Sequence, residues 1–155
     1  MTKRALVIDD HPITHLGASR LLRELGYDPV GQAMSGEEAM EQLSRDAAPD
    51  LIVLDLNLPG TGGIELIAPL REAAPEARIL VFSMNDQTGF AARALQAGAQ
   101  GFLSKNAPPS DFRDAVRQLE ADEFYLSPKQ ALALATLRAG AAGDPLGALS
   151  DRERQ

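Results

Sequence analysis

The sequence predicts an α/β fold, a doubly wound parallel β-sheet with helices on both faces. Short apolar runs suited to buried strands alternate five times with segments of helical periodicity. The clearest run, Leu51 to Leu54, is continuous and is bounded by turn residues, which is typical of a strand covered on both faces. Polar or charged residues directly follow several of these runs, and such a sheet gathers them along one edge.

The first strand is expected at Lys3 to Ile8, directly before Asp9 and Asp10. Pro12 suits the first turn of the helix that follows, because a backbone N–H would have no partner there. Asp10 could cap this helix, and Gly26 predicts its end. The apolar residues of the helix recur at helical spacing: Ile13, Leu16, Leu21, Leu22 and Leu25.

The other elements follow from the same patterns. Further strands are expected at residues 29–33, 79–82 and 101–103, and further helices at 35–43, 64–70, 86–97 and from about 110 to 121. Ser35 and Glu38 have the spacing of a capping box at the start of the second helix. Pro69 removes a backbone donor from the third helix, so we expect a kink or a shortened helix there.

The last two helices of this series differ in their apolar content. The fourth has few large apolar side chains, chiefly Phe90 and Leu95, and a thinly anchored helix is a candidate moving part. The fifth should be capped by Ser110 or Asp111. Its inward residues should be Phe112, Val116 and Leu119.

The composition changes beyond residue 121. Residues 1–121 are expected to form one domain, and residues 122–148 a linker that contains a helix at about 128–139. Ser150 to Glu153 repeats the spacing of a capping box, which predicts the start of another helix. Residues 149–155 are therefore expected to begin a second, truncated domain.

Three carboxylates, a hydroxyl and an ammonium are expected at the carboxyl edge of the sheet, from Asp9, Asp10, Asp55, Ser83 and Lys105. Crowded carboxylates repel one another unless a cation lies among them, and oxygen ligands suit Mg²⁺. Lys105 and Ser83 could bind phosphate oxygens. The set predicts a site that places a phosphoryl group on Asp55, whose alternative role is a turn former or helix cap.

With these motif positions, the stretch from Lys3 to Leu119 resembles the receiver domain of two-component response regulators. The resemblance implies a flavodoxin-like (CheY-like) fold with strand order 2-1-3-4-5 and five helices. Three further motifs are similar to those of the NarL/FixJ subfamily, in which the last of them opens a LuxR-type helix-turn-helix domain. These are Asp9-Asp10-His11-Pro12, Tyr125-Leu126-Ser127-Pro128 and Leu149-Ser150-Asp151-Arg152-Glu153-Arg154.

The resemblance also implies the roles of the site residues. In the family, a residue at the position of Ser83 is drawn to the phosphate, and the aromatic residue of the fifth strand, here Phe102, moves inward behind it. A plain core role is the alternative for Phe102. Lys105 would pair with the phosphate. The ligands of Mg²⁺ (or Mn²⁺) would be Asp9, Asp10, Asp55 and the main-chain carbonyl of Asn57.

Three residues beside the site bear on the lifetime of a phosphoryl group. Met84 stands where the family usually carries a smaller residue, and it could restrict the entry of water. Asn57 and Asn85 stand at positions that tune hydrolysis in the family, and neutral amides activate water poorly. The resemblance therefore implies a long-lived phosphoryl state.

A signalling switch is the function that the resemblance implies, rather than an enzyme. A cognate sensor histidine kinase would phosphorylate Asp55, and slow self-dephosphorylation would reset the switch. Phosphorylation would control a DNA-binding output domain and could promote a homodimer. One alternative is a phosphorylation-independent receiver that acts as an interaction module. Another is a haloacid-dehalogenase-type phosphatase, which needs a second Asp two residues after its nucleophile, where this chain has Asn57.

The composition and charge of the chain argue against several other classes of protein. The net charge of −7 and the pI near 4.8 argue against nucleic-acid binding by the residues present, so DNA binding would require the missing domain. No run approaches about 18 apolar residues, which argues against a membrane span. The absence of cysteine excludes disulfides and thiolate metal sites, and it fits a cytoplasmic protein. Neither His11 nor His15 completes a catalytic arrangement with a nucleophile.

Overall fold

The structure is a computed structural model of the 155-residue chain. It describes residues 3–58, 63–84, 88–127, 130–132 and 135. Contacts within the chain divide it into two units, residues 1–125 and 126–155. The first unit carries the whole β-sheet.

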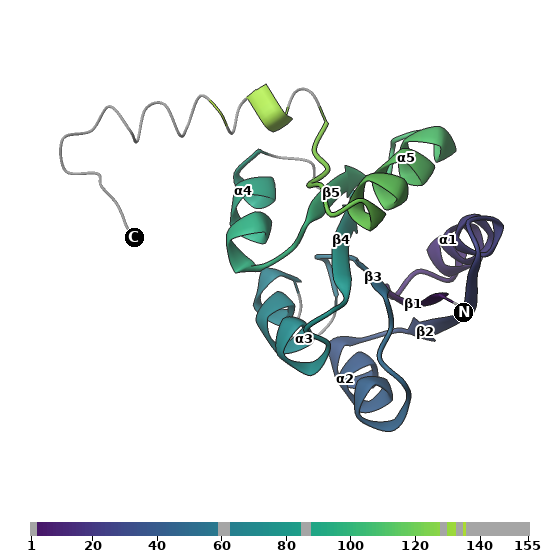
Figure 1. Ribbon diagram of the computed structural model, residues 1–155. Helices are drawn as coiled ribbons and strands as arrows, with labels where there is room; N and C mark the ends of the chain where they lie inside the picture. Colours follow the sequence, from purple (N-terminus) through teal and green to yellow (C-terminus); the bar gives the residue numbers. More distant parts are fainter. Residues whose placement is uncertain (1–2, 59–62, 85–87, 128–129, 133–134, 136–155) are drawn as a thin grey trace. The chain divides into compact units, whose positions relative to one another are not determined.

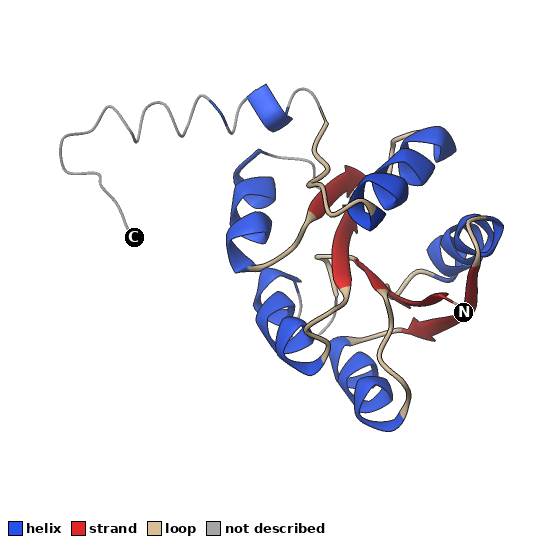
Figure 2. Cartoon of the chain, viewed as in Figure 1, coloured by secondary structure: helices blue, strands red, loops and turns tan. Residues whose placement is uncertain are grey.

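Five parallel strands form the sheet, in the order β2-β1-β3-β4-β5 (Figure 1, Figure 2). This order confirms the predicted doubly wound fold. The strands are β1 (Lys3–Ile8), β2 (Tyr27–Ala33), β3 (Leu51–Leu54), β4 (Arg78–Ser83) and β5 (Gly101–Ser104).

Helices cover both faces of the sheet. In Figure 1, α1 and α5 lie on one face, and α2, α3 and α4 lie on the other. In the part of the chain that is described, no helix has the length and apolar character needed to cross a membrane. The helices are α1 (Pro12–Glu24), α2 (Gly36–Arg45), α3 (Ile67–Ala73), α4 (Thr88–Ala97) and α5 (Pro109–Glu120), with a 3₁₀ turn at Gly63–Leu66.

The two faces of the sheet bury alternate residues of each strand, as the pleat requires. On the α1 and α5 face, one apolar cluster includes Leu22 of α1 and Phe112 of α5. Phe82 of β4 packs edge-on against Phe112, with ring centroids 5.4 Å apart. The strand residues of this cluster are Ala5, Val7, Tyr27, Val30, Leu51, Val53, Leu80 and Leu103.

The buried stripe of α1 is not made of the apolar residues whose spacing predicts the helix. His15, Ala18, Ser19 and Leu22 face the core, at the i, i+3, i+4 and i+7 positions of a helical face. Ile13 and Leu16 are 84% and 74% exposed. Because the apolar residues of α1 lie on more than one face, their spacing predicts a helix but not its buried side.

The starts of α1 and α5 differ from the cap positions considered from the sequence. The residue before α1 is His11, so the alternative role of Asp10 as a cap does not hold, and His11 makes no capping hydrogen bond through its side chain. The helix α5 starts at Pro109, after Pro108, rather than at Ser110 or Asp111. A proline at the start of a helix has a suitable fixed φ and lacks only an N–H that would have no partner, so two consecutive prolines here begin the helix earlier than the polar residues do.

Other local predictions are confirmed. The Ser35 hydroxyl accepts a hydrogen bond from the Glu38 N–H at 3.1 Å. The helix α3 is short, as Pro69 predicted: the proline lies in its first turn after a 3₁₀ turn, where its missing N–H costs little. Among the residues of α4 whose side chains are described, Ala91 and Ala94 are buried, whereas the larger Phe90 and Leu95 are only partly covered.

The chain continues along the sheet edge after α5. Tyr125 forms a parallel bridge with Gly101 of β5. Its N–H donates to the Gln100 carbonyl, and its carbonyl accepts from the Phe102 N–H, both at 3.0 Å. The strand that carries Phe102 is thus hydrogen-bonded to the last residue of the first unit.

In the second unit, the predicted helix is present in part. The Gln130 N–H donates to the Ser127 hydroxyl at 3.1 Å, and the Gln130 side chain accepts from the Ser127 N–H at 3.2 Å, which is a capping box. Residues 130–132 and 135 are helical. The remainder of the predicted helix, and residues 149–155, lie outside the described residues.

Two glycines should respond in opposite ways to replacement by alanine. A Cβ at Gly101 would lie 2.9 Å from Leu80 Cδ1, inside the core, whereas a Cβ at Gly17 of α1 would meet nothing within 4 Å. Overpacking should lower the unfolding free energy of Gly101→Ala by about 1–3 kcal/mol. The gain in helix propensity should raise that of Gly17→Ala by up to about 1 kcal/mol. Urea denaturation measures both, and a stabilised Gly101→Ala variant would contradict this packing.

Candidate functional site

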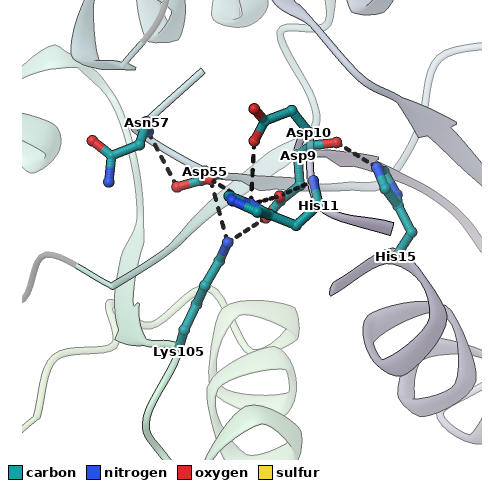
Figure 3. A network of polar contacts seen from close by, with 7 residues as sticks. All are labelled: Asp9, Asp10, His11, His15, Asp55, Asn57 and Lys105. Atoms are coloured by element: carbon teal, nitrogen blue, oxygen red, sulfur yellow. Dashed lines mark hydrogen bonds and ion pairs between the residues drawn. The ribbon is translucent and has the colours of Figure 1, made fainter. Parts of the chain in front are cut away.

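Four strands bring polar residues to one edge of the sheet, as predicted. Asp9 follows β1, Asp55 follows β3, Ser83 ends β4, and Lys105 follows β5. Lys105 Nζ lies 2.6 Å from an Asp9 carboxylate oxygen and 3.3 Å from an Asp55 oxygen (Figure 3). Asp9 and Asp55 are 1% and 2% exposed, so one ammonium group joins two buried carboxylates.

Backbone hydrogen bonds fix the two buried carboxylates. The Asp55 N–H donates to the Ile8 carbonyl at 2.9 Å, and the Asp9 N–H donates to the Ala33 carbonyl at 3.0 Å. These bonds continue the strand ladders by one residue at the sheet edge. The Asn57 N–H then donates to the Asp55 carboxylate at 3.1 Å, which turns the chain away from β3 and leaves the second carboxylate oxygen facing Lys105.

Asp10 completes an acidic group with the two buried carboxylates. One ligand atom each from Asp9, Asp10, His11 and Asp55 lie within 4.8 Å of one another. Asp10 Oδ1 is buried and accepts no hydrogen bond from the described residues; its 3.1 Å approach to His11 Nδ1 lacks hydrogen-bond geometry. A buried, unsatisfied oxygen among three carboxylates fits a hard divalent cation.

Ser83 and Phe102 lie on the same face of the sheet. Phe102 pairs with Val81 in the ladder between β4 and β5, and Ser83 is two residues further along β4, so both side chains point to the side opposite Leu80 and Leu103. This is the side covered by α4. Both side chains are fully buried.

The residues expected to tune the phosphoryl lifetime are only partly described. Met84 is 56% exposed at the end of β4, next to Ser83. Asn57 is exposed and contacts Asp55 through its backbone N–H. Asn85 lies outside the described residues.

The sequence predicts His11, next to Asp10, at the mouth of the site or facing solvent, but it does not predict the contacts that either histidine makes. His11 Nδ1 lies 2.7 Å from Asp9 Oδ1, 3.1 Å from Asp10 and 3.7 Å from Asp55. His15 is 3% exposed, and its Nε2 contacts the main-chain carbonyl of Asp9. Since a carbonyl only accepts, Nε2 is the donor. Helical side chains lean toward the N-terminus, so a histidine one turn into α1 was a signal for this contact with the preceding loop.

Comparison with known proteins agrees with the geometry. The family profile of the response regulator receiver domain matches residues 5–117. The response regulator GacA of Pseudomonas viridiflava is 36% identical over 155 residues, covering 98% of this chain and 72% of the relative. The nitrate/nitrite response regulator NarL of Escherichia coli is 39% identical over 154 residues, covering 96% of this chain and 70% of the relative.

Solved structures give the same result. A LuxR-family two-component response regulator from an Aurantimonas species has 38% sequence identity and a TM-score of 0.79, covering 90% of this chain and 99% of that chain. A response regulator from Burkholderia pseudomallei, solved with a phosphorylated aspartic acid and a calcium ion, has 30% identity and a TM-score of 0.67, covering 86% of this chain and 72% of that one. The chain therefore belongs to the receiver domains of two-component response regulators, and to their NarL/FixJ group.

Proposed function

We propose that Asp55 is the phosphoacceptor of this receiver and that the chain is a phosphorylation-dependent switch, not an enzyme with turnover. The observation that carries the proposal is the buried Asp55 carboxylate between the Lys105 ammonium and the acidic residues Asp9 and Asp10. The similar protein from Burkholderia pseudomallei, with its phosphorylated aspartic acid and calcium ion, supports a role of this kind.

The site residues have distinct tasks in the proposed reaction. An Asp55 carboxylate oxygen attacks the phosphorus atom, while the bond from phosphorus to the donor histidine nitrogen, or to the oxygen of an acyl phosphate, breaks. Lys105, already 3.3 Å from Asp55, neutralises charge on the phosphoryl oxygens. Bound Mg²⁺ would supply further neutralisation of that charge. Its protein ligands would be Asp9, Asp10, Asp55 and the Asn57 main-chain carbonyl.

Ser83 and Phe102 are proposed to convey the state of Asp55. The Ser83 hydroxyl would bind a phosphoryl oxygen, and the change would pass to Phe102 on the neighbouring strand. Phe102 has no hydroxyl, so it can report only by packing. Its backbone N–H donates to Tyr125, which supports a route from β5 to the chain that follows the receiver. A fixed core role for Phe102 is the alternative.

Met84 should lengthen the life of the phosphoryl group, because a partly exposed methionine next to Ser83 can cover Asp55 from water. Replacement of Met84 by Ala should therefore speed the loss of phosphate severalfold. Asn57 and Asn85 are proposed to add to the lifetime, since amides activate water poorly. The decay of the phosphorylated mass after removal of the donor measures the effect, with Met40→Ala in α2 as the matched control. An unchanged decay in Met84→Ala would contradict a shielding role.

The proposed partners follow from the family. A sensor histidine kinase in the cytoplasm would be the phosphoryl donor. Residues 122–148 would link the receiver to a LuxR-type helix-turn-helix domain that begins at residues 149–155, and DNA binding would belong to that domain. A homodimer through α1 and α5 is supported by the exposed Ile13 and Leu16 and by a cavity of about 230 Å³ between these helices.

Beryllofluoride, which mimics a phosphoryl group on aspartate, tests the proposal. Added with Mg²⁺, it should raise the melting temperature of the chain by about 4 °C or more, and sedimentation should show the dimer. Neither effect should occur in Asp55→Asn or without Mg²⁺. No change in the wild-type chain would favour the phosphorylation-independent interaction module. An equal change in Asp55→Asn would show that Asp55 is not the acceptor.

A further inference from the structure

We infer that the His11 side chain is a built-in competitor of the divalent cation: the ring holds the cation position and must leave when the cation binds. The inference rests on the proposed function of the acidic site and adds a control on its loading. His11 Nδ1 lies 2.7 Å from Asp9 Oδ1, 3.1 Å from Asp10 Oδ1 and 3.7 Å from Asp55 Oδ2.

The nitrogen lies where the three carboxylates converge (Figure 3). Lys105 Nζ, by comparison, contacts Asp9 and Asp55 from the β5 side. A small cation held by all three carboxylates lies about 2.1 Å from each ligand oxygen. An atom already within 3.7 Å of an oxygen from each carboxylate fills the space that such a cation and its waters need.

His11 acts as a donor in this position, which rules it out as a ligand there. An ionised carboxylate only accepts hydrogen bonds, so the 2.7 Å bond to Asp9 requires a hydrogen on Nδ1. A nitrogen that carries a hydrogen has no lone pair for a metal. Mg²⁺ also prefers oxygen ligands to imidazole. The ring therefore replaces the cation rather than binding it.

The ring can leave at little structural cost. The His11 side chain is 58% exposed, whereas that of Lys105 is 10% exposed. It makes no capping hydrogen bond to α1. The His11 backbone N–H donates separately to Asp9 Oδ1 at 2.8 Å, so the loop keeps Asp9 in place after the ring rotates into solvent. One side-chain hydrogen bond is lost, and Asp10 Oδ1, which is unsatisfied among the described residues, becomes free to bind the cation.

Titration of the full chain with Mg²⁺ tests the inference. Isothermal titration calorimetry would give the dissociation constant, and thermal unfolding in EDTA and in saturating Mg²⁺ would give the two stabilities. His11→Ala should bind Mg²⁺ roughly tenfold more tightly, because one charge-assisted hydrogen bond no longer competes. It should melt lower than the wild type in EDTA but at the same temperature in saturating Mg²⁺. His11→Gln, which keeps a side-chain donor, should fall between the two.

Each other outcome is decisive. An unchanged dissociation constant in His11→Ala would overturn the competition. If His11→Ala binds Mg²⁺ more weakly than the wild type and melts at a lower temperature in saturating Mg²⁺, His11 is a ligand of the cation instead. If the wild-type chain binds Mg²⁺ and accepts a phosphoryl group while His11→Ala behaves identically, only the inference fails. If the wild-type chain binds no Mg²⁺, the proposed function fails with it.

Discussion

Replacing Asp10 with Asn is expected to reduce both Mg²⁺ affinity and the rate of Asp55 phosphorylation by roughly 100-fold or more. Changes to groups that merely orient a metal ligand already cost about 10–100-fold, and this change removes the charge of a proposed ligand. Asp10 is the carboxylate whose buried oxygen accepts no hydrogen bond from the described residues, so the substitution should disturb little else. Calorimetry and a phosphorylation time course with acetyl phosphate measure the two effects.

The matched control is Asp114→Asn, the same chemical change on an exposed position of α5. It should leave Mg²⁺ affinity and the phosphorylation rate near the wild-type values. If Asp10→Asn also bound Mg²⁺ normally, the cation would not lie among these three carboxylates.

Lys105→Met is expected to lower the unfolding free energy in EDTA by about 3 kcal/mol, the lower part of the range for breaking a buried ion pair. The Lys105 side chain is only 10% exposed, and the side chains of its partners Asp9 and Asp55 are each 2% exposed. Removal of the ammonium leaves two buried carboxylates with less compensation. Adding Asp9→Asn to Lys105→Met should restore part of the loss, because it removes one of the two uncompensated charges.

Arg45→Met provides the comparison for a surface pair. Arg45 and Glu41 are 60% and 68% exposed and lie four residues apart on α2, so this substitution should change the unfolding free energy by less than about 0.5 kcal/mol. Urea denaturation of the wild type, of Lys105→Met with and without Asp9→Asn, and of Arg45→Met measures these differences in unfolding free energy. Equal losses in Lys105→Met and Arg45→Met would mean that the buried triad contributes no more than a surface pair.

The parts of the fold that were predictable from sequence are those set by local pattern. Continuous aliphatic runs such as Leu51 to Leu54 mark strands buried on both faces, and the residues that follow them must share one edge. For this reason the sequence alone predicts that Asp9, Asp55, Ser83 and Lys105 lie together. Pro69 likewise predicted a short α3 from its own chemistry.

The features that sequence did not reveal depend on contacts between distant elements. In α1, large apolar residues lie on more than one side, and the face that packs is set by α5 and the sheet, so Ile13 and Leu16 are exposed while Ser19 is buried. His11 illustrates the same limit at the site. The sequence shows that His11 is next to Asp10. The approach of His11 to Asp55 depends on the pairing of β1 with β3 in register.

The central claim is that Asp55 accepts a phosphoryl group with the help of a divalent cation. Intact mass of the wild-type chain and of Asp55→Asn, after incubation with acetyl phosphate with and without Mg²⁺, tests it most directly. The wild-type chain should gain the mass of one phosphoryl group only when Mg²⁺ is present, and Asp55→Asn should gain none. A gain that persists in Asp55→Asn, or a wild-type chain that gains nothing with Mg²⁺, would contradict the claim.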